Sequence, residues 1–283
     1  MSDFVPLTWP DLTGRPRPEP QAAIAYGDDP WQRVDLWLPD GRDCFPTVLM
    51  VHGGCWTTSI ADRTLMNWIA EDLRRDGYAV WNIDYRGVDR PGGGYPGTFR
   101  DAAAAADALR GYAPKYGLDL RRVVATGHSA GGHLALWLAG RKRLPQTSPL
   151  WSTTPLAIAH VVALGALPDL EATAASPDNG CGVEVIDRLV GAPDPARDVY
   201  ADTSVPRLLP LGVPHDLVNG REDRIVPYRL ATGYAGQAGD EATLHTVPDT
   251  GHVELVTPGT AAWRTAKTLI AAAFAAVNWL SPR

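Results

Sequence analysis

The chain has 283 residues, of which 45% are hydrophobic and 20% charged, and its formal net charge at pH 7 is −6. These values are typical of a globular protein, and the length favours one large α/β domain over two small domains. The acidic balance excludes a nucleic-acid-binding surface. The only basic runs, Arg74-Arg75 and Arg141-Lys142-Arg143, fall at the ends of predicted helices, where cations complement the helix dipole.

Several other classes of protein are excluded by what the chain lacks. No segment holds eighteen uninterrupted apolar residues, and the first residues have neither the basic nor the apolar part of a secretory signal. We therefore expect no membrane association and a cytoplasmic location. Three cysteines (Cys44, Cys55 and Cys181) are too few and too scattered to predict a disulfide framework or a zinc site. The histidines show no metal-ligand spacing, so neither a metal nor a cofactor is expected.

Predicted strands and helices alternate along most of the chain. Residues 1–30 are proline-rich and unpatterned, which predicts an N-terminal arm over a single domain formed by residues 31–283. Strands are predicted at 34–38, 47–51, 78–84, 122–126, 160–164, 216–219 and 243–247, and helices at 65–76, 98–116, 134–140 and 260–278. This alternation predicts an α/β fold with a mostly parallel central sheet and helices on both faces. It lapses around 168–213, a stretch too long for an ordinary loop, which predicts a small cap or lid insertion.

The segment from Gly127 to His133 carries the strongest functional signal. It reads Gly-His-Ser-Ala-Gly-Gly-His and lies between a β-branched run and a helix-forming run. A G-x-S-x-G pentad between a strand and a helix is typical of a nucleophile elbow, in which the serine occupies a strained turn and exposes its hydroxyl. A side chain on Gly127 or Gly131 would collide with the neighbouring strand or helix. Ser129 is therefore the predicted nucleophile.

A serine nucleophile needs a base and an acid, which follow it in the order Ser, Asp/Glu, His in an α/β-hydrolase. Asp223 follows the predicted strand that ends at residue 219, and His252 follows the last strand, so we assign them as acid and base. The rivals are less suitable: His245 lies inside a strand, His215 and Asp216 lie at the wrong end of one, Glu222 should point elsewhere, and Asp249 needs a loop that folds back.

The third part of the site is the run His52-Gly53-Gly54-Cys55-Trp56, directly after a buried strand. Glycines let the main chain approach a substrate closely, and a tetrahedral oxyanion needs two or three converging amide N–H groups. We assign these donors to Gly54, Cys55 and Ala130. Cys55 as an alternative nucleophile is disfavoured because no histidine pairs with it in the sequence and Ser129 already occupies the elbow.

These segments together resemble the α/β-hydrolase superfamily. Within it, the run from His52 to Trp56 matches the HGGxW element of the kynurenine formamidase (arylformamidase) group, and the GHSAGG and Gly251-His252 segments are similar to that group's serine and histidine segments. The hormone-sensitive-lipase-type esterases carry HGGG instead. The resemblance covers residues 34 to 280, but residues 170–205 match no assignable cap.

The resemblance implies a serine hydrolase that cleaves the formamide bond of an arylamine such as N-formylkynurenine through an acyl-enzyme. The alternative is a carboxylesterase of the hormone-sensitive-lipase-like type that acts on small esters. A non-catalytic binding protein on the same fold is disfavoured because all three triad members are present. The expected partner is a small-molecule substrate, and a homodimer is left open as the assembly.

Overall fold

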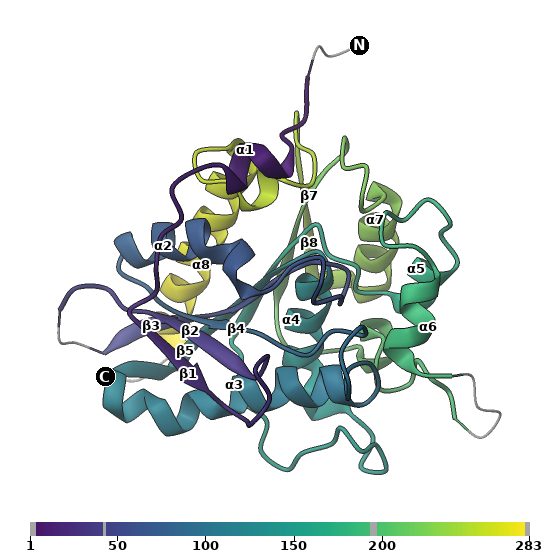
Figure 1. Cartoon of the computed structure of the whole chain (residues 1–283), viewed down its shortest axis with the longest axis horizontal. Coiled ribbons are helices and arrows are strands. Elements are labelled where there is room, and N and C mark those ends of the chain that lie inside the picture. The colour runs from purple at the N-terminus through teal and green to yellow at the C-terminus, as the bar shows by residue number, and fades with distance from the viewer. Residues whose placement is uncertain (1–3, 42–43, 193–196, 281–283) are drawn as a thin grey trace.

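The computed structural model describes residues 4–41, 44–192 and 197–280. Within them, one sheet runs in the order β1-β2-β4-β3-β5-β6-β7-β8 (Figure 1). Its strands are β1 (Ala22–Ala25), β2 (Arg33–Trp37), β3 (Phe45–Val51), β4 (Ala79–Ile83), β5 (Leu118–His128), β6 (His160–Leu164), β7 (His215–Gly220) and β8 (Ala242–Val247). The pairs β1–β2 and β2–β4 are antiparallel, and the pairs from β4 through β3 to β8 are parallel. The predicted α/β-hydrolase architecture, with a mostly parallel sheet, is confirmed.

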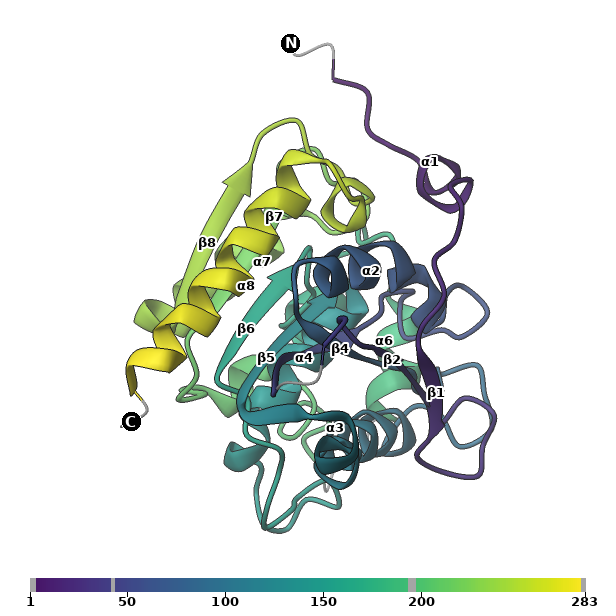
Figure 2. The same cartoon turned by 90° about the vertical axis from the view of Figure 1, so that its left-hand side faces the viewer.

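Helices cover both faces of this sheet (Figures 1 and 2). Helices α2 (Asn67–Arg75) and α8 (Ala261–Leu280) pack on one face, and α3 (Gly97–Tyr116), α4 (Ala130–Gly140) and α7 (Tyr228–Ala238) pack on the other. In the central strand β3, Val48 and Met50 contact the first layer, and Leu49 and Val51 contact the second. All four side chains are fully buried, as expected of a parallel strand covered on both faces.

The register of the parallel strands places the functional loops at one edge of the sheet. Val51 at the end of β3 pairs with Gly127 near the end of β5, and His128 pairs with Leu164 at the end of β6. Gly220 at the end of β7 pairs with Val247 at the end of β8. The loops after β3, β5, β7 and β8 therefore emerge together, at the edge where open α/β sheets place their ligands.

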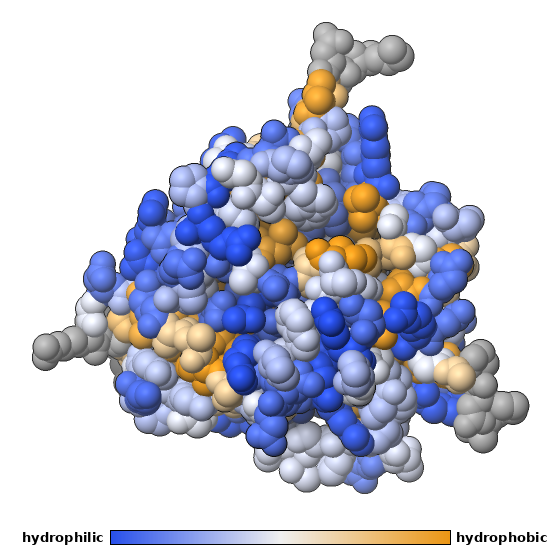
Figure 3. All heavy atoms as spheres, viewed as in Figure 1, coloured by the Kyte–Doolittle hydropathy of each residue, from blue (hydrophilic) through white to orange (hydrophobic). Residues whose placement is uncertain are grey.

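Two segments without a regular sequence pattern have defined structure. Between β6 and β7 the chain forms α5 (Leu170–Ala174), α6 (Glu184–Val190) and a 3-10 turn, Val205–Leu208. The N-terminal segment forms α1 (Trp9–Thr13) and then β1, which pairs with β2 as an edge strand. Backbone carbonyls of Pro16 and Pro18 accept hydrogen bonds from Trp68 Nε1 at 3.1 Å and from Asn67 Nδ2 at 3.0 Å on α2. Hydrophobic side chains reach the surface beside α1 (Figure 3).

No helix in the described ranges combines the length and the apolar character that crossing a bilayer requires. The cytoplasmic location remains a prediction.

Candidate active site

The nucleophile elbow forms at Ser129, between β5 and α4. Ser129 has φ 56° and ψ −122°, a conformation that L-residues rarely adopt and that tight packing must maintain. A Cβ on Gly127 would lie 2.2 Å from the carbonyl oxygen of Gly131, and one on Gly131 would lie 2.2 Å from that of Val51. Both glycines are therefore required sterically. The Ser129 hydroxyl is buried and has no hydrogen-bond partner among the described residues.

The predicted acid and base are joined directly by a hydrogen bond. His252 Nδ1 donates to Asp223 Oδ2 at 2.7 Å, and both residues are buried. The other carboxylate oxygen of Asp223 accepts the backbone N–H groups of Ile225 at 2.8 Å and Val226 at 2.9 Å. These two bonds fix the carboxylate, which in turn fixes the ring orientation of His252 and leaves its Nε2 as the nitrogen available for proton transfer.

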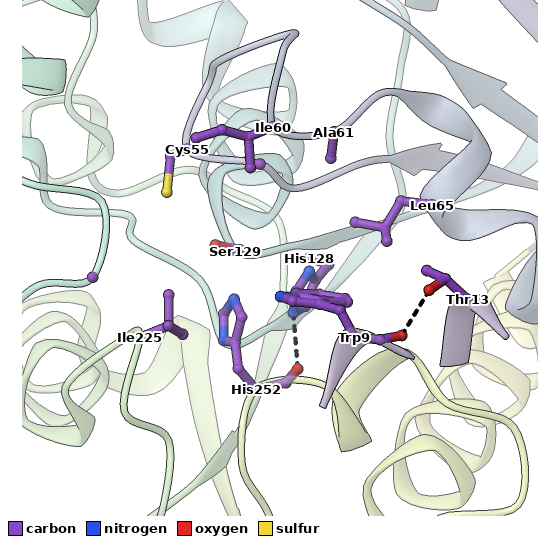
Figure 4. A pocket seen from close by; sticks show the side chains of 12 residues that line it. Trp9, Thr13, Cys55, Ile60, Ala61, Leu65, His128, Ser129, Ile225 and His252 are labelled. Atoms are coloured by element: carbon purple, nitrogen blue, oxygen red, sulfur yellow. Dashed lines mark hydrogen bonds between the residues drawn. The ribbon is translucent and has the colours of Figure 1, made fainter. Parts of the chain in front are cut away.

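Ser129 and His252 line one cavity of about 370 Å³ (Figure 4). The walls are mostly apolar and contain no Lys, Arg, Asp or Glu. The lining residues are Trp9, Thr13, Gly54, Cys55, Ile60, Ala61, Leu65, His128, Ser129, Gly180, Ile225 and His252. The structure thus brings together the predicted nucleophile, the predicted base and two of the three predicted oxyanion-hole residues, Gly54 and Cys55.

The loop after β3 lies directly against the predicted nucleophile, Ser129. A Cβ on Gly53 would lie 3.1 Å from the Cβ of Ser129, so only glycine fits there without displacement. Gly54 has φ 107°, which strongly favours glycine, and Cys55 and Trp56 both have φ 51°. Ala130 is the first residue of α4, next to the nucleophile, so its amide belongs to the positive end of that helix.

A buried polar network supports this loop from behind. His52 Nδ1 donates to the carbonyl of Gly53 at 2.7 Å, and His52 Nε2 lies 2.9 Å from Asp84 Oδ1. The second oxygen of Asp84 accepts from Arg63 Nη1 at 2.8 Å. The His52 ring stacks on Tyr85, whose hydroxyl donates to the His52 carbonyl at 3.0 Å. Hydrogen bonds and stacking therefore hold both the side chain and the main chain of His52.

His128 lies against His252, the predicted base, rather than in solvent. Its Nε2 donates to the backbone carbonyl of His252 at 3.1 Å, and the two ring centroids are 4.2 Å apart. Burial, and secondarily the charge of His252, lower the pKa of His128 well below its usual value. His128 therefore stays neutral and would not repel a positive charge on His252.

His133 links three parts of the site. Its Nδ1 accepts from Trp56 Nε1 at 3.2 Å, and its Nε2 donates to the carbonyl of Thr203 at 2.8 Å, in the segment between β6 and β7. Burial lowers the pKa of His133 to about 4, although the bond to Thr203 opposes this shift. Helix α4, the loop after β3 and the segment between β6 and β7 are thus joined through one neutral imidazole.

The rival histidines lie away from the cavity. Asp216, near the start of β7, lies 2.7 Å from His160 Nε2 at the start of β6 and 2.6 Å from His245 Nε2 within β8, and none of the three lines the cavity. His215 Nε2 is 3.0 Å from the hydroxyl of Tyr234. Within the described ranges, no group of three His, Cys, Asp or Glu side chains is arranged to hold a metal ion.

Two features of the cavity wall were missed by the sequence analysis. Cys55 and Cys181 form a single disulfide, whereas the sequence predicted only that the three cysteines make no disulfide framework. Trp9, in the unpatterned N-terminal segment, places its ring edge-on to both His128 and His252, at centroid distances of 6.0 and 6.3 Å. Neither feature leaves a local signal, because the partners are distant in the sequence.

Solved structures share the fold at low sequence identity. Esterase B from Lactobacillus rhamnosis matches with a TM-score of 0.76 and 23% identity, over 93% of this chain and 90% of that chain. An esterase from Thermogutta terrifontis, solved with propionate bound, gives a TM-score of 0.72 and 20% identity, over 93% of this chain and 96% of that chain. At such identities these matches show the fold alone, which is that of the α/β-hydrolases.

Curated relatives are esterases by name. Esterase LipC of Mycobacterium tuberculosis is 26% identical over 75% of this chain and 53% of its own length. A probable isoprenylcysteine alpha-carbonyl methylesterase of Arabidopsis thaliana is 32% identical over 42% of this chain and 24% of its own length. The chain thus spans about half of the first relative and about a quarter of the second.

The BD-FAE family model matches residues 34–235, from β2 into α7. The match is more than two thirds of the chain and includes the loop after β3, the nucleophile elbow and Asp223. The chain therefore belongs to the BD-FAE family, on an α/β-hydrolase fold.

Proposed function

We propose that this protein is a carboxylesterase that hydrolyses small uncharged esters through an acyl intermediate on Ser129. The observation that carries the proposal is the 2.7 Å hydrogen bond between His252 Nδ1 and Asp223 Oδ2 beside a cavity that Ser129 also lines. A nucleophile, an oriented base and a fixed acid on successive strand-end loops are the parts that acyl transfer requires.

In the proposed reaction, Ser129 Oγ attacks the ester carbonyl carbon while His252 Nε2 accepts the hydroxyl proton. The carbonyl oxygen becomes an oxyanion, and the amides of Gly54, Cys55 and Ala130 stabilise it. His252 then donates its proton to the leaving alkoxide as the C–O bond breaks, which leaves the acyl group on Ser129. A water molecule, deprotonated by His252, attacks this ester, releases the carboxylic acid and restores the Ser129 hydroxyl.

The cavity supports a small, uncharged substrate. Its volume of about 370 Å³ is at the lower end of the range for ligand pockets, roughly 300–1,000 Å³. N-formylkynurenine carries an ammonium and a carboxylate, and no charged Lys, Arg, Asp or Glu lines the cavity to pair with them. The names of the curated relatives also favour ester over formamide cleavage. The arylformamidase hypothesis keeps only the support of the sequence resemblance in the HGGxW, GHSAGG and Gly251-His252 segments.

The test compares kcat/KM for short-chain p-nitrophenyl esters with that for N-formylkynurenine. We expect measurable ester hydrolysis and a much lower value for the formamide. Ser129→Ala should abolish ester turnover while thermal unfolding stays close to that of the wild type. A higher kcat/KM for N-formylkynurenine would replace the esterase proposal with the formamidase hypothesis, and a fully active Ser129→Ala variant would refute both.

A further inference from the structure

The disulfide between Cys55 and Cys181 lies in the wall of the catalytic cavity. It joins residues 126 positions apart, with their Cα atoms 5.4 Å from each other. Cys55 belongs to the loop after β3 and lines the cavity, and Cys181 belongs to the segment between β6 and β7, next to the cavity-lining Gly180. One covalent bond therefore connects the loop that should bind the oxyanion to the segment that contributes Gly180 to the cavity wall.

At its first end, the disulfide acts on a strained turn. Cys55 and Trp56 are consecutive non-glycine residues with φ 51°, a conformation that persists only where surrounding contacts enforce it. The Trp56 side of the turn is held by its bond to His133 and by its carbonyl, which accepts from Val88 N at 2.7 Å. On the Cys55 side, the side chain is held by the disulfide. The direction of the Cys55 amide thus depends on both constraints.

At its second end, the disulfide connects to the catalytic acid through a short series of hydrogen bonds. Asn179 Oδ1 accepts from Cys181 N at 3.0 Å, and Gly180 N donates to the carbonyl of Ile225 at 2.7 Å. Ile225 N donates in turn to Asp223 Oδ1 at 2.8 Å. A Cβ on Gly180 would lie 2.9 Å from the Cα of Ile225, so these two segments are in close contact.

We propose that Cys181 is a positioning residue of this active site: through its disulfide it fixes the Cys55 amide in the direction needed to stabilise the oxyanion. This inference rests on the proposed function.

A dithiol reductant would release the constraint that the disulfide places on Cys55. Its thiolate attacks one sulfur, the S–S bond breaks, and the other sulfur leaves as a thiolate that takes up a proton. The second thiol of the reagent then displaces the first sulfur, which gives two protein thiols and a cyclic oxidised reagent.

The consequence should appear in kcat more than in KM, because the oxyanion exists only in the transition state and the tetrahedral intermediate. Complete loss of one oxyanion donor lowers kcat by about 10²–10³. A donor that is loosened rather than removed should cost less, so we expect Cys181→Ser to lower kcat by roughly tenfold to a hundredfold on that scale. A purely structural disulfide would lower the unfolding temperature and leave kcat of the folded fraction unchanged.

The experiment uses the full chain with Cys181→Ser, and with Cys44→Ser as the matched control because Cys44 is outside the disulfide. Ester kcat and KM are measured well below the unfolding transition, together with the rate at which a p-nitrophenyl phosphonate modifies Ser129. Dithiothreitol should bring wild type and Cys44→Ser to the level of Cys181→Ser, and should not affect Cys181→Ser. If Cys181→Ser does not fold, reduction of the folded wild-type protein provides the same comparison.

The outcomes separate the two proposals. Unchanged kcat and unchanged phosphonylation in Cys181→Ser, or after reduction verified by thiol alkylation, would overturn the positioning role and leave the esterase proposal intact. If the wild type hydrolyses no ester, but Cys181→Ser is phosphonylated more slowly than the wild type, the positioning role is supported and the esterase proposal is refuted. Because disulfides persist mainly in oxidising compartments, a positive result would also count against the predicted cytoplasmic location.

Discussion

His133 should make the folded protein less stable at acid pH, by an amount that can be calculated from its environment. Trp56 Nε1 donates to His133 Nδ1, so a proton on that nitrogen would place two donors against each other in a fully buried site. The pKa of about 4 in the folded state lies below the usual value of 6.5 in the unfolded chain. The unfolded chain therefore binds more protons between these values, and stability is lost as the pH falls from about 6.5 toward about 4.

The magnitude follows from the two pKa values. From about pH 7 to about pH 5, the free energy of unfolding should fall by about 2 kcal/mol from His133 alone. At pH values below both pKa values the full loss approaches roughly 3 kcal/mol, since one pKa unit corresponds to about 1.4 kcal/mol. His128 contributes in the same direction, because its pKa is also lowered by burial.

Urea unfolding of the wild type and of His133→Gln at the two pH values isolates this contribution. Glutamine does not titrate and keeps one acceptor and one donor group. The variant should be less stable at neutral pH, but it should lose about 2 kcal/mol less than the wild type on acidification. An equal loss in both proteins would refute the assignment of a neutral, acid-sensitive His133.

Two further substitutions test the site itself. Asp223→Asn should keep the fold but lower kcat by up to about 10⁴-fold, because an amide can stabilise neither the required tautomer of His252 nor its imidazolium form. In steady-state ester kinetics, a change in KM with an unchanged kcat would contradict the triad. Trp9→Ala should raise the preference for longer acyl chains by roughly tenfold, because Trp9 also lines a neighbouring cavity of about 490 Å³ that the substitution would open to the catalytic one. An unchanged preference across a p-nitrophenyl ester series, with Trp9→Phe as the conservative control, would contradict a role for Trp9 in selectivity.

The regular part of the fold could be predicted because buried parallel strands and amphipathic helices leave continuous patterns. The predicted strand at 47–51 lies within β3, and the predicted helix at 98–116 lies within α3. Helix α7 and strand β1 lie outside the predicted ranges. The sequence of β1, Ala-Ala-Ile-Ala, has little strand preference and forms only an edge strand beside β2. Strand β5 begins at Leu118 rather than at 122, because its first residues pair with Phe45 and Pro46 beyond a register shift.

The chemical groups of the site could be predicted for a related reason. Ser129, Asp223 and His252 each follow a strand that the pattern identifies, and parallel strands bring their ends to one edge of the sheet. The bond between His252 and Asp223 has the predicted partners. The oxyanion donors are a different case: the structure places Gly54 and Cys55 in the cavity wall, and their role remains a proposal.

The walls that should select the substrate could not be predicted, because they come from segments whose sequences have no periodicity. Trp9 belongs to the N-terminal segment, and Gly180 belongs to the stretch between β6 and β7. Each segment depends on contacts with distant residues, and the 126-residue separation between Cys55 and Cys181 shows how long-range these contacts are. Local sequence therefore constrains the reaction in this protein more tightly than the substrate. A resemblance based on the loop from His52 to Trp56 can indicate acyl transfer, but the choice between ester and formamide depends on walls formed elsewhere in the chain.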